Sequence, residues 1–170
     1  MTTIIAVETK SGVIMGCDSQ MTGGGKVTLA EGKIVRNGNF VISVCGRARA
    51  IQQIRYADLP SPTPGEDLDR FMATTFVTAV QKVFADAGLR EGENEVLVAY
   101  KGRVFHFHAD MTVLRDASGI YTSGSGGVWA RAYLSGLDKI TAKDVETALR
   151  VAAKNDPYSA EPFHVIELTR

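Results

Sequence analysis

The chain has few of the residues that mark specialised classes of protein. Its 170 residues include only two cysteines, five prolines and one tryptophan. Two cysteines cannot support a disulfide scaffold, and both Cys17 and Cys45 lie within apolar runs, so we expect buried thiols of a cytoplasmic protein. The 19 basic side chains are balanced by 19 acidic ones. This balance removes any global electrostatic reason to bind nucleic acid or an anionic membrane surface.

Long hydrophobic runs are also missing. No stretch approaches the roughly 18 apolar residues that a membrane helix requires, and the first twenty residues do not have the pattern of a secretory signal. We therefore expect no membrane contact and a cytoplasmic location. The composition, with 45% hydrophobic and 22% charged residues, is that of a globular protein. Its length predicts one domain that spans residues 1–170.

Runs of β-branched and apolar residues predict strands at both ends and in the middle of the chain. Residues 3–7 and 13–17 form a predicted hairpin, and residues 33–35 and 40–45 form a second one around the turn signal Asn37-Gly38. Three further strands are expected at residues 95–100, 103–108 and 163–168.

Helical periodicity is confined to two parts of the chain. A short helix is expected at residues 48–59, and a longer amphipathic helix at residues 66–87. Another pair is expected at residues 128–135 and from Thr141, where Asp144 three residues later completes a capping box. The apolar faces of the two longer helices consist of Met72, Phe76, Val80, Val83 and Ala87, and of Val145, Ala148, Leu149 and Ala152. Separate blocks of strands and helices favour an α+β fold, in which helices cover sheets.

The second residue is a threonine, which acquires a chemical meaning if the residue ahead of it is removed. Removal of Met1 would give Thr2 both a hydroxyl nucleophile and a free α-amine that can act as a base. An unperturbed α-amine has a pKa of about 7.7 to 8.0. A neighbouring cation would hold that pKa down, and an anion would position the cation. Lys33 and Asp18 are candidates for these two roles.

Five segments in the same order resemble proteasome β-type subunits, and most of all the bacterial HslV peptidase family. The segments are Thr2-Thr3-Ile4-Ile5-Ala6-Val7, Gly12-Val13-Ile14-Met15-Gly16-Cys17-Asp18-Ser19-Gln20, Gly32-Lys33-Ile34-Val35-Arg36, Gly124-Ser125-Gly126-Gly127 and Asp156-Pro157-Tyr158-Ser159. The resemblance extends over almost the whole chain. It implies an N-terminal nucleophile hydrolase, a four-layer αββα sandwich with two stacked sheets between helices.

The same resemblance implies the roles of particular residues. Thr2 would be the nucleophile of a threonine endopeptidase, tuned by Lys33 and Asp18. The backbone N–H of Gly46 would form the oxyanion hole, which typically contributes on the order of 10²-fold or more in rate. The remaining site residues that it implies are Ser125, near the amine, and Asp156 and Ser159, which support the site from behind.

The family also implies partners. The chain would assemble into a homo-oligomeric double ring that encloses its sites and degrades polypeptides. It contains no G-x-x-x-x-G-K-[ST] motif, so an ATPase unfoldase would be a separate protein. The chemistry requires no cofactor. A monovalent cation such as sodium, bound by backbone carbonyls near Ala153, Asp156 and Ser159, is implied as well.

The chain departs from the family pattern just after Gly46. Family members usually show an Ala-Asp pair there, whereas this chain has Arg47 and Arg49. If either arginine lines the pocket for the residue before the cut, acidic side chains would be preferred through a charge-assisted contact. Alternatively, both arginines are exposed at the start of a helix.

Other functions stay open at this stage. A chain that retained Met1 would have an amide at Thr2, and would be a non-catalytic structural ring subunit of the same superfamily. His106, His108 and Asp110 alternate along a strand, and with His164 they could bind a metal. The glycine-rich loop at residues 124–127 could hold a phosphate, although no lysine follows it.

Overall fold

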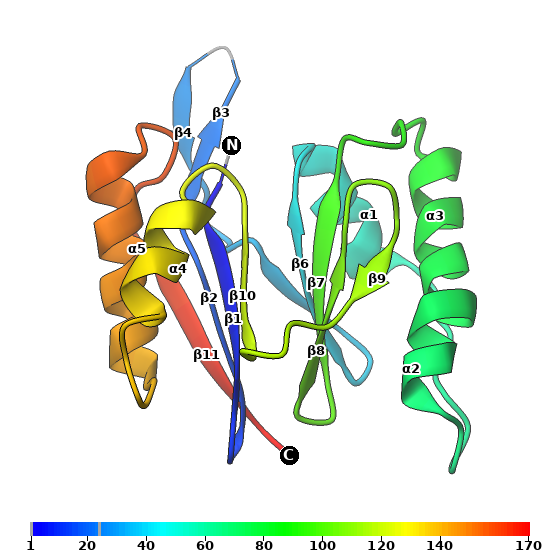
Figure 1. Ribbon diagram of the computed structural model, residues 1–170. Helices are drawn as coiled ribbons and strands as arrows, with labels where there is room; N and C mark the ends of the chain where they lie inside the picture. Colours follow the sequence, from blue (N-terminus) through cyan, green and yellow to red (C-terminus); the bar gives the residue numbers. More distant parts are fainter. Residues whose placement is uncertain (1, 24) are drawn as a thin grey trace.

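The computed structural model describes residues 2–23 and 25–170. Two β-sheets lie face to face between two layers of helices (Figure 1). This is the four-layer order that the resemblance implied. Met1, whose removal the nucleophile hypothesis requires, lies outside the described residues.

The first sheet has the strand order β10-β1-β2-β11 and is antiparallel throughout. Its strands are β1 (Ile4–Thr9), β2 (Gly12–Cys17), β10 (Ile120–Ser123) and β11 (His164–Thr169). Both the β1–β2 hairpin and the last strand were predicted. The pairing of β1 with β10 brings the N-terminal segment against the glycine-rich loop that follows Ser123.

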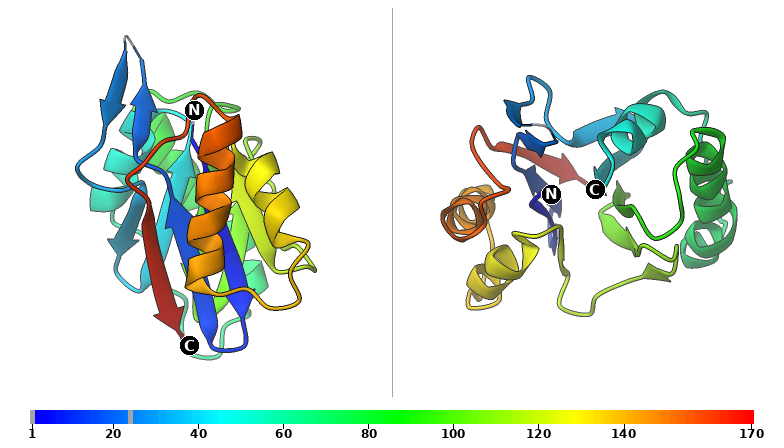
Figure 2. Two further views of the ribbon diagram at one scale, coloured as in Figure 1. Left: turned by 90° about the vertical axis from the view of Figure 1, so that its left-hand side faces the viewer. Right: turned by 90° about the horizontal axis from the view of Figure 1, so that it is seen from above.

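The second sheet has the order β5-β6-β7-β8-β9, again antiparallel. Its strands are β5 (Ile34–Asn37), β6 (Phe40–Cys45), β7 (Glu95–Tyr100), β8 (Arg103–Phe107) and β9 (Val113–Leu114). A separate small hairpin of β3 (Gln20–Thr22) and β4 (Lys26–Thr28) projects beyond the end of the sheets (Figures 1 and 2).

Helices α4 (Gly127–Leu134) and α5 (Ala142–Asn155) cover the first sheet. The second sheet is covered by α1 (Ala48–Tyr56) and by a continuous helical run of α2 (Leu68–Phe71), the π-helical segment η1 (Met72–Phe76) and α3 (Val77–Asp86). Seen from above, the two helical layers lie on opposite sides of the paired sheets (Figure 2). No helix among the described residues has the length and apolarity needed to span a membrane.

Three apolar clusters separate the four layers. Along β1, Ile4 and Ala6 face the second sheet, whereas Ile5 and Val7 face α4 and α5. Along β7, Leu97 and Ala99 contribute to the cluster between the sheets, while Val96, Val98 and Tyr100 face the helices. Because successive strand side chains point to opposite faces, strands covered on both sides are apolar at nearly every position.

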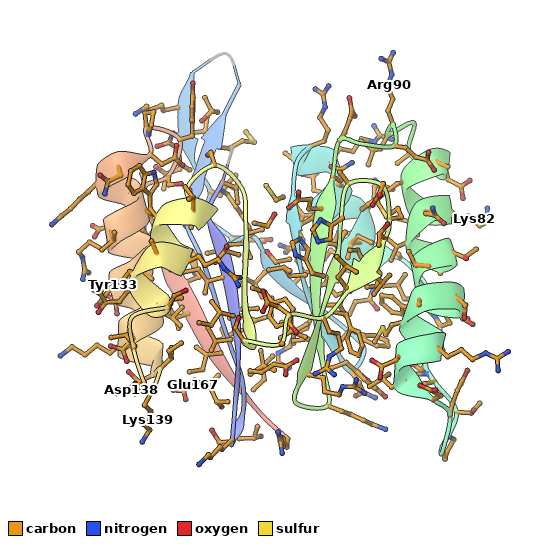
Figure 3. The ribbon with its side chains drawn as sticks, in the orientation of Figure 1. Lys82, Arg90, Tyr133, Asp138, Lys139 and Glu167 are labelled. Atoms are coloured by element: carbon orange, nitrogen blue, oxygen red, sulfur yellow. The ribbon has the colours of Figure 1, made fainter. Side chains whose placement is uncertain are left out.

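Charged side chains lie on the outer helical faces. Lys82 on α3 points away from the sheets (Figure 3) and pairs with Asp86 one turn later, at 2.9 Å. On the other outer layer, the capping box of Thr141 and Asp144 begins α5 as predicted. All four residues expected on the buried face of α5 are fully buried.

The structure differs from the sequence prediction in the long helix and in four short strands. The run at residues 66–87 was expected to be one regular helix, but its centre is π-helical. The wider π-helical turn carries the buried Met72 and Phe76, and Val80 and Phe84 continue the buried face along α3. Phe84 is therefore buried, whereas Val83 is only partly buried. The strands β3, β4, β9 and β10 were not predicted.

Candidate active site

The ammonium group of Lys33 is the centre of the candidate site. Lys33 immediately precedes β5 and is 5% exposed. Its Nζ donates to Thr2 Oγ1 at 2.7 Å, to Asp18 Oδ1 at 2.7 Å and to the carbonyl of Gln20 at 2.6 Å. An ammonium has three protons, and each of them has an acceptor here. The geometry therefore holds a lysine cation against the threonine hydroxyl.

Asp18 follows the end of β2 and has no exposed surface. Its Oδ1 accepts the N–H of Thr3 at 2.9 Å, and its Oδ2 accepts the N–H of Gln20 at 2.9 Å and that of Ala160 at 3.4 Å. Backbone N–H donors and the lysine together stabilise the ionised carboxylate. Asp18 thus fixes the position of Lys33.

Thr2 lies just ahead of β1 and is 7% exposed. The N–H of Gly126 points at its carbonyl oxygen, at 3.5 Å. Gly124 has a φ of +90°, and a Cβ built there would lie 2.0 Å from the same oxygen. Only glycine fits this close approach. The glycine-rich loop is therefore packed against the backbone of Thr2, which accounts for its composition without a bound phosphate.

A second polar cluster lies behind the threonine pair. Asp156, the residue that ends α5, accepts at Oδ2 from Ser125 Oγ at 2.8 Å and from Ser159 Oγ at 2.6 Å. Ser159 Oγ also lies 2.6 Å from Thr3 Oγ1. These contacts connect the end of α5 to the residue after Thr2, so the structure brings Ser125, Asp156 and Ser159 together beside the Lys33 cluster.

Gly46 follows the last residue of β6 and has a φ of +141°. A Cβ built at this position would lie 2.3 Å from the carbonyl oxygen of Glu93 and 2.4 Å from Asn94 Oδ1. The N–H of the next residue, Arg47, donates to Asn94 Oδ1 at 2.9 Å. Asn94 is 2% exposed. The buried amide thus holds the backbone on which the expected oxyanion donor lies.

The two arginines after Gly46 lie on the surface at the beginning of α1. Arg47 pairs with Glu93 at 2.9 Å, with its own side chain 66% exposed. Arg49 lies in the first turn of α1 and is exposed. The preference for acidic side chains stays a prediction. Because Arg47 is already paired with Glu93, Arg49 is the arginine that would contact such a side chain.

Both cysteines are free thiols. Cys17 is fully buried at the end of β2, and burial raises the pKa of its thiol to about 12. Cys45 was also expected to be buried, but it is only half-buried, because it ends β6 at the open edge between the sheets. Burial also raises the pKa of the Cys45 thiol.

The residues implied for a monovalent cation lie around the end of α5. Ala153 is in its last turn, where carbonyl groups have no partner further along the helix. The carbonyl of Asp156 accepts the N–H of Ser159 at 3.3 Å. Carbonyl oxygens at a helix C-terminus have the chemistry and the partial charge that suit a cation such as sodium. Its binding stays a prediction.

Three residues at the site were missed by sequence reasoning. Thr3 links the two polar clusters, Gln20 supplies a carbonyl to Lys33, and Asn94 holds the backbone after Gly46. Thr3 follows Thr2, and Gln20 lies two residues after Asp18, so their closeness in sequence to predicted site residues could have pointed to them. No local pattern marks Asn94, which reaches the site only through the β6–β7 pairing.

Comparison with known proteins defines the class of fold. No protein-family model matches the chain, and no curated protein matches it either. Solved structures do match, and they have the fold of proteasome-like N-terminal nucleophile hydrolases. The resemblance noted in the sequence is thus confirmed at the level of fold.

Three of these structures illustrate the likeness. Thiobacillus denitrificans BPH in complex with epoxomicin is 23% identical, with a TM-score of 0.77 over 99% of this chain and 100% of that chain. HslV from Trypanosoma brucei is 22% identical, with a TM-score of 0.68 over 96% and 97%. Anbu from Yersinia bercovieri is 16% identical, with a TM-score of 0.71 over 96% and 80%.

The buried ion pair leads to a prediction about stability. Asp18→Asn removes the anion and leaves the Lys33 ammonium buried without its counter-charge. We expect a loss of about 3–5 kcal/mol in the free energy of unfolding. Urea unfolding followed by circular dichroism measures it.

The matched control is Glu146→Gln, which breaks the ion pair with Arg150 at 2.9 Å on the surface of α5. An exposed pair one turn apart contributes only about 0.3–0.5 kcal/mol. Equal losses in the two variants would contradict the importance of the buried pair.

Proposed function

We propose that this chain is a threonine-type endopeptidase subunit in which Thr2 is the nucleophile once Met1 has been removed. The observation that carries the proposal is the 2.7 Å contact between Lys33 Nζ and Thr2 Oγ1, inside a buried site where Asp18 balances the lysine charge. A structural threonine has no need of a buried ammonium at its hydroxyl. An attacking hydroxyl does, because the cation stabilises the negative charge that develops on the oxygen.

The first half of the reaction forms an ester. Thr2 Oγ attacks the scissile carbonyl, and its proton passes to the free α-amine of the same residue. The resulting oxyanion accepts the N–H of Gly46, whose backbone is held in place by the contact of Asn94 with the next residue. Collapse of this intermediate breaks the peptide C–N bond, and the α-ammonium returns the proton to the leaving amine.

The second half releases the product. Water attacks the ester with the α-amine as base, and the Thr2 hydroxyl is restored. Ser125, Asp156 and Ser159 position the amine and the backbone around it through their hydrogen bonds to one another and to Thr3. No step requires a cofactor. A monovalent cation bound near Ala153 would rigidify the loop that carries Asp156 and Ser159.

Assembly and partners are part of the same proposal. The single chain exposes large apolar side chains, among them Tyr56 at 84% and Val128 at 66%. Contacts between copies of the chain in a double ring would cover such side chains. Polypeptides would then reach the sites only through the ring, and a separate ATPase would unfold and deliver them.

A non-catalytic ring subunit is the second candidate. Its basis is chemical, since retention of Met1 would convert the Thr2 amine into an amide that cannot act as a base. The buried charges would then serve only to join strand ends. The two candidates differ in one covalent property, the free amine.

Epoxomicin tests the proposal directly. We expect the purified protein to have lost the mass of Met1 and to gain one stable adduct per chain on incubation with this peptide epoxyketone, which reacts with the amine and the hydroxyl of an N-terminal threonine. Intact-mass spectrometry measures both changes. Native mass spectrometry of the same sample gives the number of chains in the assembly.

Thr2→Ala should form no adduct, while Thr28→Ala, at an exposed threonine of β4, should react like the unaltered protein. Retention of Met1, or the absence of an adduct in every variant, would contradict the peptidase proposal and support the non-catalytic ring subunit.

Asn94 gives a prediction about positioning. Asn94→Ala removes the acceptor of the Arg47 N–H and lets the backbone at Gly46 move. A displacement of about 1 Å at a catalytic group can cost about 10²-fold in rate, so we expect kcat for peptide hydrolysis to fall by this order with little change in KM. Asn94→Asp keeps an oxygen acceptor and should restore part of kcat. Equal rises in KM for both variants would indicate a general loss of structure instead.

Arg49 tests the specificity hypothesis. If it contacts the residue before the cut, Arg49→Glu should lower the ratio of kcat/KM for acidic against apolar peptides by about tenfold or more, as expected for a charge-assisted contact. Arg36→Glu, at an exposed arginine of β5, is the control. Faster cleavage of apolar than of acidic peptides by the unaltered protein would exclude the hypothesis.

A further inference from the structure

Glu95, His106 and His108 meet on the inner face of the second sheet. Glu95 begins β7, and His106 and His108 lie at the end of β8 and one residue beyond it. Leu97, two residues after Glu95, is directly opposite His106 and belongs to the cluster between the sheets. Side chains two residues apart share a face. All three potential ligands therefore point into the space between the two sheets.

Their side chains are already close together. One ligand atom from each residue can be chosen so that all three lie within 4.8 Å of one another. His106 Nε2 is 3.4 Å from Glu95 Oε2, and the two imidazole rings stack with centroids 4.2 Å apart. Ligands about 2.0–2.1 Å from a tetrahedral zinc ion lie about 3.4 Å apart. Small rotations of His108 would complete the arrangement.

One of these atoms makes no hydrogen bond outside the cluster within the described part of the chain. His106 Nε2 is buried and, apart from its 3.4 Å contact with Glu95 Oε2, has no polar partner among residues 2–23 and 25–170. A buried nitrogen without a partner costs free energy, so such atoms are rare without a functional reason.

The surroundings have the features of a supported site. Ser123 Oγ donates to Glu95 Oε2 at 2.5 Å and so orients the carboxylate from the opposite sheet. Ligands held by such outer hydrogen bonds are typical of protein metal centres. A pocket of about 460 Å³, lined by both histidines and by residues of β10, gives an ion a way in. The two arginines on its wall are paired with Asp116 and Glu8, which reduces their repulsion of a cation.

We propose that Glu95, His106 and His108 form a binding site for a divalent first-row cation of the zinc class. Two imidazoles and one carboxylate are a ligand set that zinc accepts, with a fourth position left for water or another group. The site is distinct from the Thr2–Lys33 cluster. It adjoins that cluster through Ser123, which precedes the loop packed on Thr2.

This set differs from the one that the sequence suggested. Asp110 was expected to join the histidines, but it lies on an exposed turn, where its Oδ1 accepts the N–H of Thr112 at 2.9 Å. His164 is in β11 of the other sheet, paired with Cys17. Neither residue belongs to the cluster, and the third ligand comes instead from the neighbouring strand.

Isothermal titration of the metal-free protein with Zn²⁺ tests the site, and absorption spectra with Co²⁺ report the ligand geometry. We expect one ion per chain and a four-coordinate Co²⁺ spectrum. Glu95→Gln, His106→Asn and His108→Asn should each weaken Zn²⁺ binding by more than the about 10–100-fold that loss of an outer hydrogen bond costs. Ser123→Ala should weaken it by about tenfold.

Asp110→Asn, His164→Gln and Cys45→Ser are the matched controls and should bind Zn²⁺ as the unaltered protein does. Circular dichroism of each metal-free variant shows whether it folds. If one ligand variant does not fold, the other two ligand variants test the site. No binding by the unaltered protein would overturn the proposal, and so would binding that survives both histidine substitutions or is lost with Cys45. Because Thr2→Ala should still bind Zn²⁺, failure of the peptidase proposal would leave this result unchanged.

Discussion

The buried ammonium of Lys33 is the interaction on which the rest of the structure depends. An isolated charge in a protein interior costs several kcal/mol, and this cost is offset only when good geometry satisfies each proton. The three acceptors come from the segment before β1, the residue after β2 and the start of β3. A single side chain therefore joins three strand ends that are far from β5 in the sequence. The Thr2 hydroxyl is held in place because each proton of the buried ammonium needs an acceptor.

Polar side chains extend the same constraint to the outer helical layer. Thr3 donates its N–H to Asp18 and shares a 2.6 Å contact with Ser159, whose hydroxyl in turn reaches Asp156 at the end of α5. A buried polar network stabilises the fold most when every polar group in it is hydrogen-bonded, because unpaired buried groups make it less stable than an apolar core. The end of α5 is thereby held in register with the start of β1. Helix, sheet and candidate nucleophile behave as one unit.

Much of the fold follows from local pattern, and the exceptions have physical reasons. The two N-terminal hairpins, the four helical regions and the capping box at Thr141 were predictable because each depends on residues close in sequence. β9 has only two residues, and β10 is a strand because it pairs with the distant β1 rather than because of its own sequence. The π-helical turn at residues 72–76 buries Met72 and Phe76 against the second sheet, and no local propensity points to it. Site residues were anticipated where they belong to family motifs, whereas Asn94 acts through a cross-strand contact.

The residues of the proposed metal site show that the same limit applies elsewhere in the chain. Alternation along β8 correctly puts His106 and His108 on one face, but the third ligand depends on register, which pairs the start of β7 with the end of β8. Because the strands are antiparallel, one edge of the sandwich, on the side of Thr2, holds the ends of β6, β8 and β10 and the start of β7 (Figure 1). Chain ends and turns at that edge carry the polar side chains that a packed sheet interior excludes. The candidate nucleophile and the proposed cation site can therefore coexist there with Ser123 between them, and the apolar layers below need no change to accommodate either one.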